Sequence, residues 1–111
     1  MKNVMMIEDQ RAVIEYDPDI EMFRGEFVGL NGSADFYAKN ITGLKQEGKA
    51  SLIVFLQMCA EEGLTPFKKH SGKFVLRLDP SIHHAATVAS KADGLSLNQW
   101  VAKLIQERAV V

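Results

Sequence analysis

One short run of alternating residues near the C-terminus constrains the fold of this chain more than any other feature. In residues 73–78 (KFVLRL) every second side chain is apolar. As a β-strand, this run has an apolar face of Phe74, Leu76 and Leu78 and an outer face of Lys73, Val75 and Arg77. A strand and two helices in about forty residues bury too little surface for a core, and a lone strand leaves both edges unpaired. We therefore expect a homodimer, or a higher even oligomer, in which two copies pair this strand as an antiparallel ribbon.

The two helices that follow the strand are predicted from the residues at their starts. Asp79-Pro80 predicts the first helix, with Asp at the N-cap and Pro at the first helical position, where its missing N–H costs nothing. Gly94 ends this helix, and Ser96 and Gln99 fit a capping box that begins a second helix. The positions expected to face inward are Ile82, Ala85, Ala86, Ala89 and Ala92 on the first helix and Leu97, Val101, Leu104 and Ile105 on the second.

The expected dimer has an apolar core and a surface suited to DNA. Its core is predicted to consist of Phe74, Leu76, Leu78, Trp100, Val101 and Leu104. A two-stranded ribbon fits the major groove, so the outward side chains Lys73, Val75 and Arg77 are the predicted base contacts. Arg77 can bond guanine in a bidentate way, whereas Val75 offers only apolar contact, for example to a thymine methyl group. The start of the second helix, at Ser96, Leu97 and Asn98, presents backbone N–H groups and a positive dipole end to a phosphate.

The N-terminal part of the chain is predicted to be a small α+β domain. Three strands are expected at residues 12–16, 22–30 and 34–38, separated by an Asp17-Pro18-Asp19 turn and an Asn31-Gly32 hairpin signal. Met5-Met6 fits either the start of a further strand or a frayed end. A helix is expected over residues 43–62, with Leu44, Gly48, Leu52, Phe55 and Cys59 on one face and Gly63 as its stop. Two glycines make the first half of this helix intrinsically weak.

The net charge of −1 conceals two regions of opposite sign. Residues 1–67 hold six basic and eleven acidic side chains, a net charge of −5, and residues 68–111 hold seven and three, a net charge of +4. The sign changes within a connector, residues 64–72, that contains Pro66, Lys68 and Lys69. We place the domain boundary near residue 70, which gives domains of residues 1–69 and 70–111. A basic C-terminal domain is attracted to phosphate, and an acidic N-terminal domain to a basic partner.

Several other classes of protein are not favoured by the sequence. The longest apolar run is too short for a membrane span, and residues 1–10 do not fit a signal peptide, so a cytoplasmic protein with no membrane partner is expected. Cys59, the single cysteine, excludes an internal disulfide and fits a buried helix position. No metal, cofactor or catalytic residue is predicted. Three of the four acids that a nuclease centre would need, Asp17, Asp19 and Glu21, fall in one turn, and the fourth is Asp35.

The chain resembles the HicB antitoxin family over nearly its whole length. The most specific part is residues 94–101 (GLSLNQWV), supported by residues 72–78 (GKFVLRL) and by Pro80, His83 and Ala89. These residues resemble the ribbon-helix-helix domain of that family and, more broadly, the Arc and MetJ repressors. Weaker resemblance covers residues 14–17 (IEYD), 23–30 (FRGEFVGL) and 58–63 (MCAEEG).

The resemblance implies a fold, a function and a partner. It implies a partial RNase-H-like βββα domain followed by a dimeric ribbon-helix-helix (βαα) domain. The implied function is that of a non-enzymatic antitoxin, which neutralises a HicA-like ribonuclease toxin and represses its own operon by binding operator DNA. Val75 differs from the polar residue often found at the centre of the base-contacting triplet. Two alternatives stay open, namely a stand-alone ribbon-helix-helix regulator with no toxin partner and a degenerate nuclease that retains activity.

Overall fold

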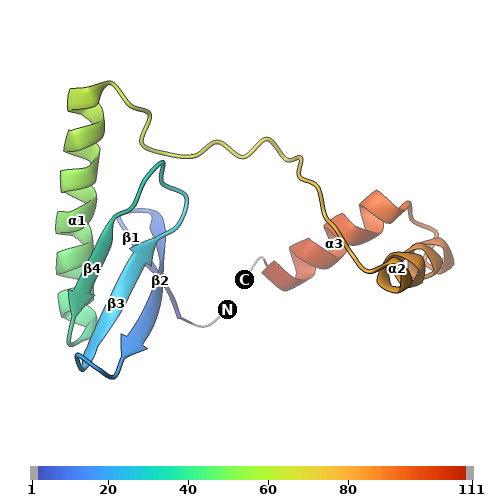
Figure 1. Ribbon diagram of the computed structural model, residues 1–111, viewed down its shortest axis with the longest axis horizontal. Helices are drawn as coiled ribbons and strands as arrows, with labels where there is room; N and C mark the ends of the chain where they lie inside the picture. The colour runs from blue at the N-terminus through green and yellow to red at the C-terminus, as the bar shows by residue number, and fades with distance from the viewer. Residues whose placement is uncertain (1–2, 110–111) are drawn as a thin grey trace. The chain divides into compact units, whose positions relative to one another are not determined.

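The computed structural model describes residues 3–109, and the chain divides into two compact units between His70 and Ser71. We call residues 3–70 the N-terminal unit and residues 71–109 the C-terminal unit. The N-terminal unit contains all the strands of the described residues and one helix, and the C-terminal unit contains two helices (Figure 1). Among residues 3–109, no helix is both long and apolar enough to cross a lipid bilayer.

The N-terminal unit is a four-stranded antiparallel sheet with a helix on one face. Its strands β1 (Val4–Ile7), β2 (Gln10–Asp17), β3 (Met22–Phe27) and β4 (Asp35–Ala38) lie in the order of the sequence, so β1 and β4 are the edges. The helix α1 (Ile41–Glu62) runs along the sheet and contacts β4 most extensively (Figure 1). The α+β prediction is confirmed at this level, whereas the partial RNase-H-like assignment stays a prediction.

The fourth strand, β1, corrects the three-stranded prediction. It pairs with β2 through a turn in which Glu8 and Asp9 both have positive φ, 49° and 63°. Two successive residues with positive φ make a type I′ turn, which matches the twist of a hairpin and normally contains Asn or Gly. Since Glu-Asp carries no such signal, the sequence left Met5-Met6 undecided. The structure places both residues inside β1.

The helix α1 matches its predicted face. Its buried residues are the five predicted ones, Leu44, Gly48, Leu52, Phe55 and Cys59. The helix begins two residues earlier than predicted, because the Asn40 side chain caps it by accepting a hydrogen bond from Gly43 N at 2.7 Å. It ends at Gly63, which has φ 66° as expected for a helix stop.

The core of the N-terminal unit is built around Phe36 on β4. The ring of Phe36 lies over Gly25 of β3, where a Cβ atom would come within 2.2 Å of the ring. It also contacts Phe27, with ring centroids 5.2 Å apart. On the helix side, a Cβ at Gly48 would lie 2.6 Å from Ile7 and 3.1 Å from Phe36. Gly48 therefore lets α1 approach the sheet closely, and the glycine that weakens the isolated helix serves the packing of the domain.

The first part of the connector is bound to the N-terminal unit. Asn31 donates its side-chain N–H to the carbonyls of Thr65 (2.8 Å) and Phe67 (3.3 Å) and its backbone N–H to that of Pro66 (2.9 Å). The backbone N–H of Lys68 donates to Gly29 O at 2.8 Å, and Leu30 and Phe67 form an isolated bridge. Asn31-Gly32 is thus not the two-residue turn that was predicted. It lies within a longer β3–β4 loop, residues 28–34, and Asn31 anchors the connector.

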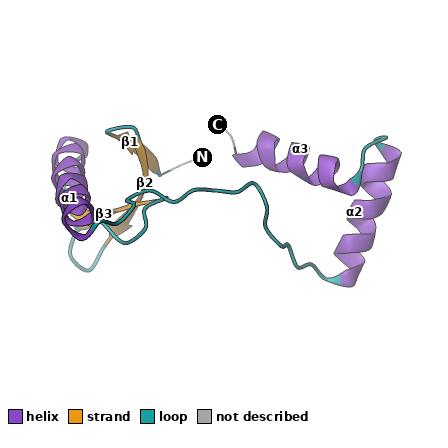
Figure 2. Cartoon of the chain, turned by 90° about the horizontal axis from the view of Figure 1, so that it is seen from above, coloured by secondary structure: helices purple, strands orange, loops and turns teal. Residues whose placement is uncertain are grey.

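The C-terminal unit consists of α2 (Pro80–Ala92) and α3 (Leu97–Ala109), which lie across one another (Figure 2). Both helices begin at the predicted residues. Asp79 occupies the N-cap of α2, but its side chain accepts no capping hydrogen bond. The predicted strand over residues 73–78 is absent from the single chain, where these residues have no regular secondary structure. The physical reason is that a strand needs a partner for its lateral N–H and C=O groups, and within one chain the described residues supply none.

Candidate functional site

The start of α3 has the geometry that a capping box requires. Ser96 Oγ accepts the backbone N–H of Gln99 at 3.0 Å, and Gln99 Oε1 accepts the backbone N–H of Ser96 at 2.9 Å. Trp100 donates its indole N–H to Asp93 Oδ2 at 3.0 Å, which ties the first turn of α3 to the end of α2. The α2–α3 junction is therefore held by specific hydrogen bonds, although its side chains are largely exposed.

The same geometry leaves donors for an anion. The first N–H groups of a helix have no partner within it, and at α3 these belong to Leu97 and Asn98. No acidic residue lies in the first turn. Asn98 is exposed and Leu97 is partly exposed. The predicted phosphate contacts Ser96, Leu97 and Asn98 therefore lie together at one helix start, which is suited to bind an anion.

Some side chains of residues 73–78 line a hollow, and others do not. Phe74, Leu76 and Leu78 line a hollow of about 530 Å³ against α2 and α3, together with Val101 and Ile105. We call this cavity the α2–α3 hollow. Lys73 also lines it, but Val75 and Arg77 are absent from its wall, and Val75 is 85% exposed. The three predicted apolar residues thus line the hollow, and so does Lys73, one of the three predicted outward residues.

The apolar side chains around this hollow are not covered by the single chain. Phe74 keeps 72% of its surface exposed and Leu76 keeps 54%. In the described part of the C-terminal unit, only Ala86 and Ser90 are buried. Of the other predicted core residues, Trp100 and Val101 are partly buried and Leu104 is 50% exposed. The predicted inward positions of α3 thus lack a partner surface within one chain.

The N-terminal unit has a groove between β4 and α1 with a volume of about 640 Å³. We call it the β4–α1 groove. Its wall includes Tyr37, Val54 and Met58, which are 44%, 65% and 42% exposed, and the acidic Glu47. Sequence reasoning missed this groove, because it depends on how α1 lies against the edge strand and not on any local motif.

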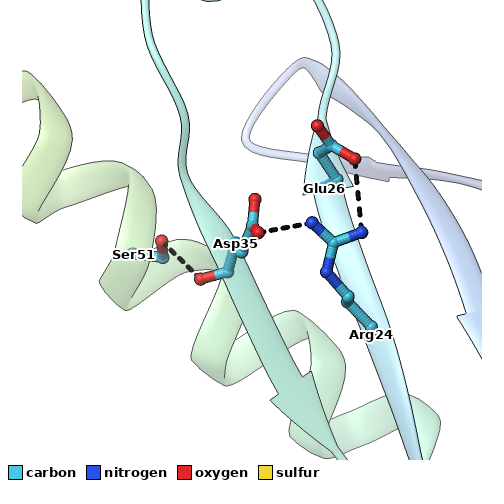
Figure 3. A network of polar contacts seen from close by, with 4 residues as sticks. All are labelled: Arg24, Glu26, Asp35 and Ser51. Atoms are coloured by element: carbon cyan, nitrogen blue, oxygen red, sulfur yellow. Dashed lines mark hydrogen bonds and ion pairs between the residues drawn. The ribbon is translucent and has the colours of Figure 1, made fainter. Parts of the chain in front are cut away.

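A polar network lies beside the groove (Figure 3). The Arg24 guanidinium pairs with Asp35 across the β3–β4 ladder and with Glu26 on its own strand, and Ser51 of α1 donates its hydroxyl to the backbone carbonyl of Asp35 at 3.1 Å. The hydrogen bond from Arg24 to Asp35 raises the pKa of the guanidinium above its usual value, so Arg24 stays charged. Among residues 3–109, no three His, Cys, Asp or Glu side chains are grouped so as to hold a metal ion.

Comparison with known proteins adds one finding. Residues 55–105 match the family model described as HicB family, a stretch that runs from the second half of α1 to within α3. No curated protein and no solved structure has significant similarity to the chain. The match covers a little less than half of the chain, and over this stretch the chain is similar to the HicB family.

Proposed function

We propose that this chain is an antitoxin that neutralises a HicA-like ribonuclease toxin and represses its operon as a dimeric ribbon-helix-helix protein. In this proposal it is a cytoplasmic protein without catalytic activity. The observation that carries the proposal is the uncovered apolar surface of residues 74–78 beside the α2–α3 hollow. Since burial of apolar surface drives folding, a segment that leaves Phe74, Leu76 and Leu78 exposed needs a partner surface.

A second copy of the same chain meets this need. Two antiparallel copies of residues 73–78 would satisfy each other's backbone groups and cover both hollows with the same apolar side chains. Pairing turns Lys73, Val75 and Arg77 of both copies to the outside of the ribbon. From there they reach the base edges in the major groove, while the α3 starts bind flanking phosphates and fix the register. The net charge of residues 68–111, +4, favours DNA as a partner.

The acidic N-terminal unit is the proposed toxin-binding unit. Residues 1–67 carry a net charge of −5, and the HicB resemblance implies a basic toxin. The β4–α1 groove offers exposed apolar side chains next to Glu47, the pattern of an apolar interface centre with a charged rim. A nuclease function is disfavoured because the Asp35 carboxylate is engaged by Arg24 and Asp17 Oδ1 accepts the backbone N–H of Asp19.

One observation favours a second candidate, a stand-alone regulator. The family match covers residues 71–105 of the C-terminal unit and part of α1, but none of the four strands. A chain that kept its DNA-binding unit and lost its toxin would give the same match. The two candidates share every DNA-binding feature and differ only in whether the N-terminal unit binds a toxin.

The deciding experiment titrates fragments against both partners. Fragments of residues 1–70 and 71–111 keep the anchored connector with the unit that it contacts. We expect the first to bind the basic toxin encoded beside the gene, faster at low salt, and not to bind DNA. The second should dimerise and bind DNA but not toxin. A Val54→Asp variant in the groove should weaken toxin binding at least tenfold, whereas Ile53→Asp, on the same helix but outside the groove wall, should not.

Two results would change the proposal. Toxin binding by residues 71–111 would contradict the division between the units. DNA binding without toxin binding by any fragment or by the full chain would establish the stand-alone regulator.

A further inference from the structure

Residues 63–78, which include the connector and the predicted strand, contain several basic side chains and no acidic one. No acidic residue lies between Glu62 and Asp79, whereas Lys68, Lys69, Lys73 and Arg77 all fall in this interval, together with His70. Every one of these five side chains belongs to an exposed residue. Five Lys, Arg or His side chains within ten residues are a higher density of basic side chains than anywhere else in the chain.

Among the residues that the structure describes, none of these cations has an ion-pair partner. The three ion pairs of the described residues join Arg24 to Glu26 and Asp35 and Lys49 to Glu8, all within the N-terminal unit. In contrast, no carboxylate among residues 3–109 lies within ion-pair distance of Lys68 or Lys69. Leaving lysines unpaired in a connector costs little in water, but it makes them available to an external polyanion.

Hydrogen bonds within the N-terminal unit limit how far the side chains of Lys68 and Lys69 can reach. The Asn31 anchor and the Lys68–Gly29 hydrogen bond hold the connector backbone up to residue 68. Residues 69–79 then continue without regular secondary structure to the start of α2. Lys69 precedes Lys73 by four residues, a span of at most about 14 Å. Duplex DNA carries a charge about every 1.7 Å along its axis, so several phosphates lie within that distance of a base contacted by Lys73.

We infer that Lys68 and Lys69 form a phosphate-binding arm, which contacts the DNA backbone outside the base pairs read by the ribbon. This inference rests on the proposed DNA-binding function and adds a second contact region to it. An acidic protein is a less suitable partner, because the same segment continues directly into the predicted base-reading residues. The arm adds affinity and salt dependence without sequence preference, since phosphates are the same at every step.

The test uses the full-length protein and a duplex selected by the wild type from a random pool. Lys68→Gln/Lys69→Gln removes the two charges and leaves the backbone hydrogen bond of residue 68 in place. The matched control is Lys39→Gln/Lys45→Gln, which removes two exposed lysines of the N-terminal unit. Binding constants are measured from 50 to 200 mM salt, on a duplex ending at the selected site and on one extended by about five base pairs on each side.

We expect the arm variant to have a shallower salt dependence. Each lost phosphate contact lowers the slope of log K against log salt by about 0.9, so four lysines per dimer lower it by up to about 3.6. The preference for selected over random DNA should not change. The wild type should bind the extended duplex more tightly than the short one, and the arm variant should lose that gain. The control should behave as the wild type.

Three outcomes would overturn the inference. The first is a salt slope equal to that of the control, and the second is an equal gain from flanking DNA in variant and wild type. Either would show that the arm does not contact DNA while leaving the proposed function intact. The third is a wild type that binds no duplex, which would remove the proposed function as well.

Discussion

The two units of this chain satisfy the same apolar requirement in different ways. The N-terminal unit gathers eleven buried apolar residues into one cluster between its sheet and α1. The C-terminal unit buries only Ala86 and Ser90 among its described residues, and eight of its large apolar side chains are exposed. A unit with a closed core can fold alone, whereas a unit with an open one depends on a partner. We therefore expect the N-terminal unit to be stable as a monomer and the stability of the C-terminal unit to depend on protein concentration.

The largest effect is expected from a charge placed in the predicted ribbon. Leu76→Asp places a carboxylate in the predicted dimer core, where an unpaired buried charge costs several kcal/mol. We expect loss of the dimer by light scattering and loss of DNA binding, with the N-terminal unit still folded. The matched control is Val75→Asp, because Val75 lies outside the hollow wall and is 85% exposed. Val75→Asp should keep the dimer and weaken DNA binding. A folded dimer in Leu76→Asp would show that residues 73–78 do not form the interface.

The second prediction concerns the closed core. Phe36→Ala removes the ring that lies over Gly25 and against Gly48, and we expect it to lower the free energy of unfolding of the N-terminal unit by about 3–5 kcal/mol. Tyr37→Ala, one residue further along β4 and 44% exposed, is the control and should cost much less. Chemical denaturation followed by circular dichroism measures both. DNA binding should be unchanged in both variants. A loss of DNA binding in Phe36→Ala alone would show that the units are energetically coupled.

Features that depend on neighbouring residues could be predicted from the sequence, whereas features that depend on distant residues could not. The inward face of α1 and the capping box of α3 depend on residues close together in the chain, and both were predicted residue by residue. β1 was left undecided because its hairpin turn uses Glu8 and Asp9, which lack the usual turn signal. The Asn31 anchor was missed because its partners, residues 65–67, lie more than thirty positions away. Gly48 was interpreted as a weakness of the helix, since only the packed sheet reveals its close contact with Ile7 and Phe36.

The candidate site shows most clearly which features could not be predicted from the sequence. The alternation in residues 73–78 predicts that three apolar side chains face the helices, and these three line the α2–α3 hollow together with Lys73, which was predicted to face outward. The strand itself is not formed in the single chain, because no segment among the described residues pairs with it. The partner that we propose for it is a second copy of the chain. The β4–α1 groove had no sequence signal, since Tyr37, Val54 and Glu47 converge only after α1 has packed on the sheet.

The third prediction separates base reading from phosphate binding within the open unit. Arg77→Ala should weaken binding to a selected operator by about 1–3 kcal/mol, because a bidentate contact to guanine is lost, with a much smaller effect on random DNA. Arg108→Ala, in the last turn of α3, is the charge-matched control and should change both affinities little. Binding is measured by fluorescence anisotropy on both DNA pools at one salt concentration. Equal losses on operator and random DNA would make Arg77 a phosphate contact.

A small effect is expected at the start of α3, where a local capping interaction stabilises a helix of the unit that has no closed core. Ser96→Ala removes the oxygen that accepts the Gln99 N–H at 3.0 Å, and the loss of such a cap costs about 1 kcal/mol. In a dimer both copies lose the cap, so the midpoint of thermal unfolding should fall at every protein concentration while its concentration dependence stays the same. Gln106→Ala, at an exposed position of α3, should leave the midpoint nearly unchanged.

Because Ser96 is also a predicted phosphate contact, the DNA affinity of Ser96→Ala should fall further than the change in stability requires. A loss of stability without that additional loss of affinity would remove Ser96 from the DNA interface and leave it only a role as helix cap.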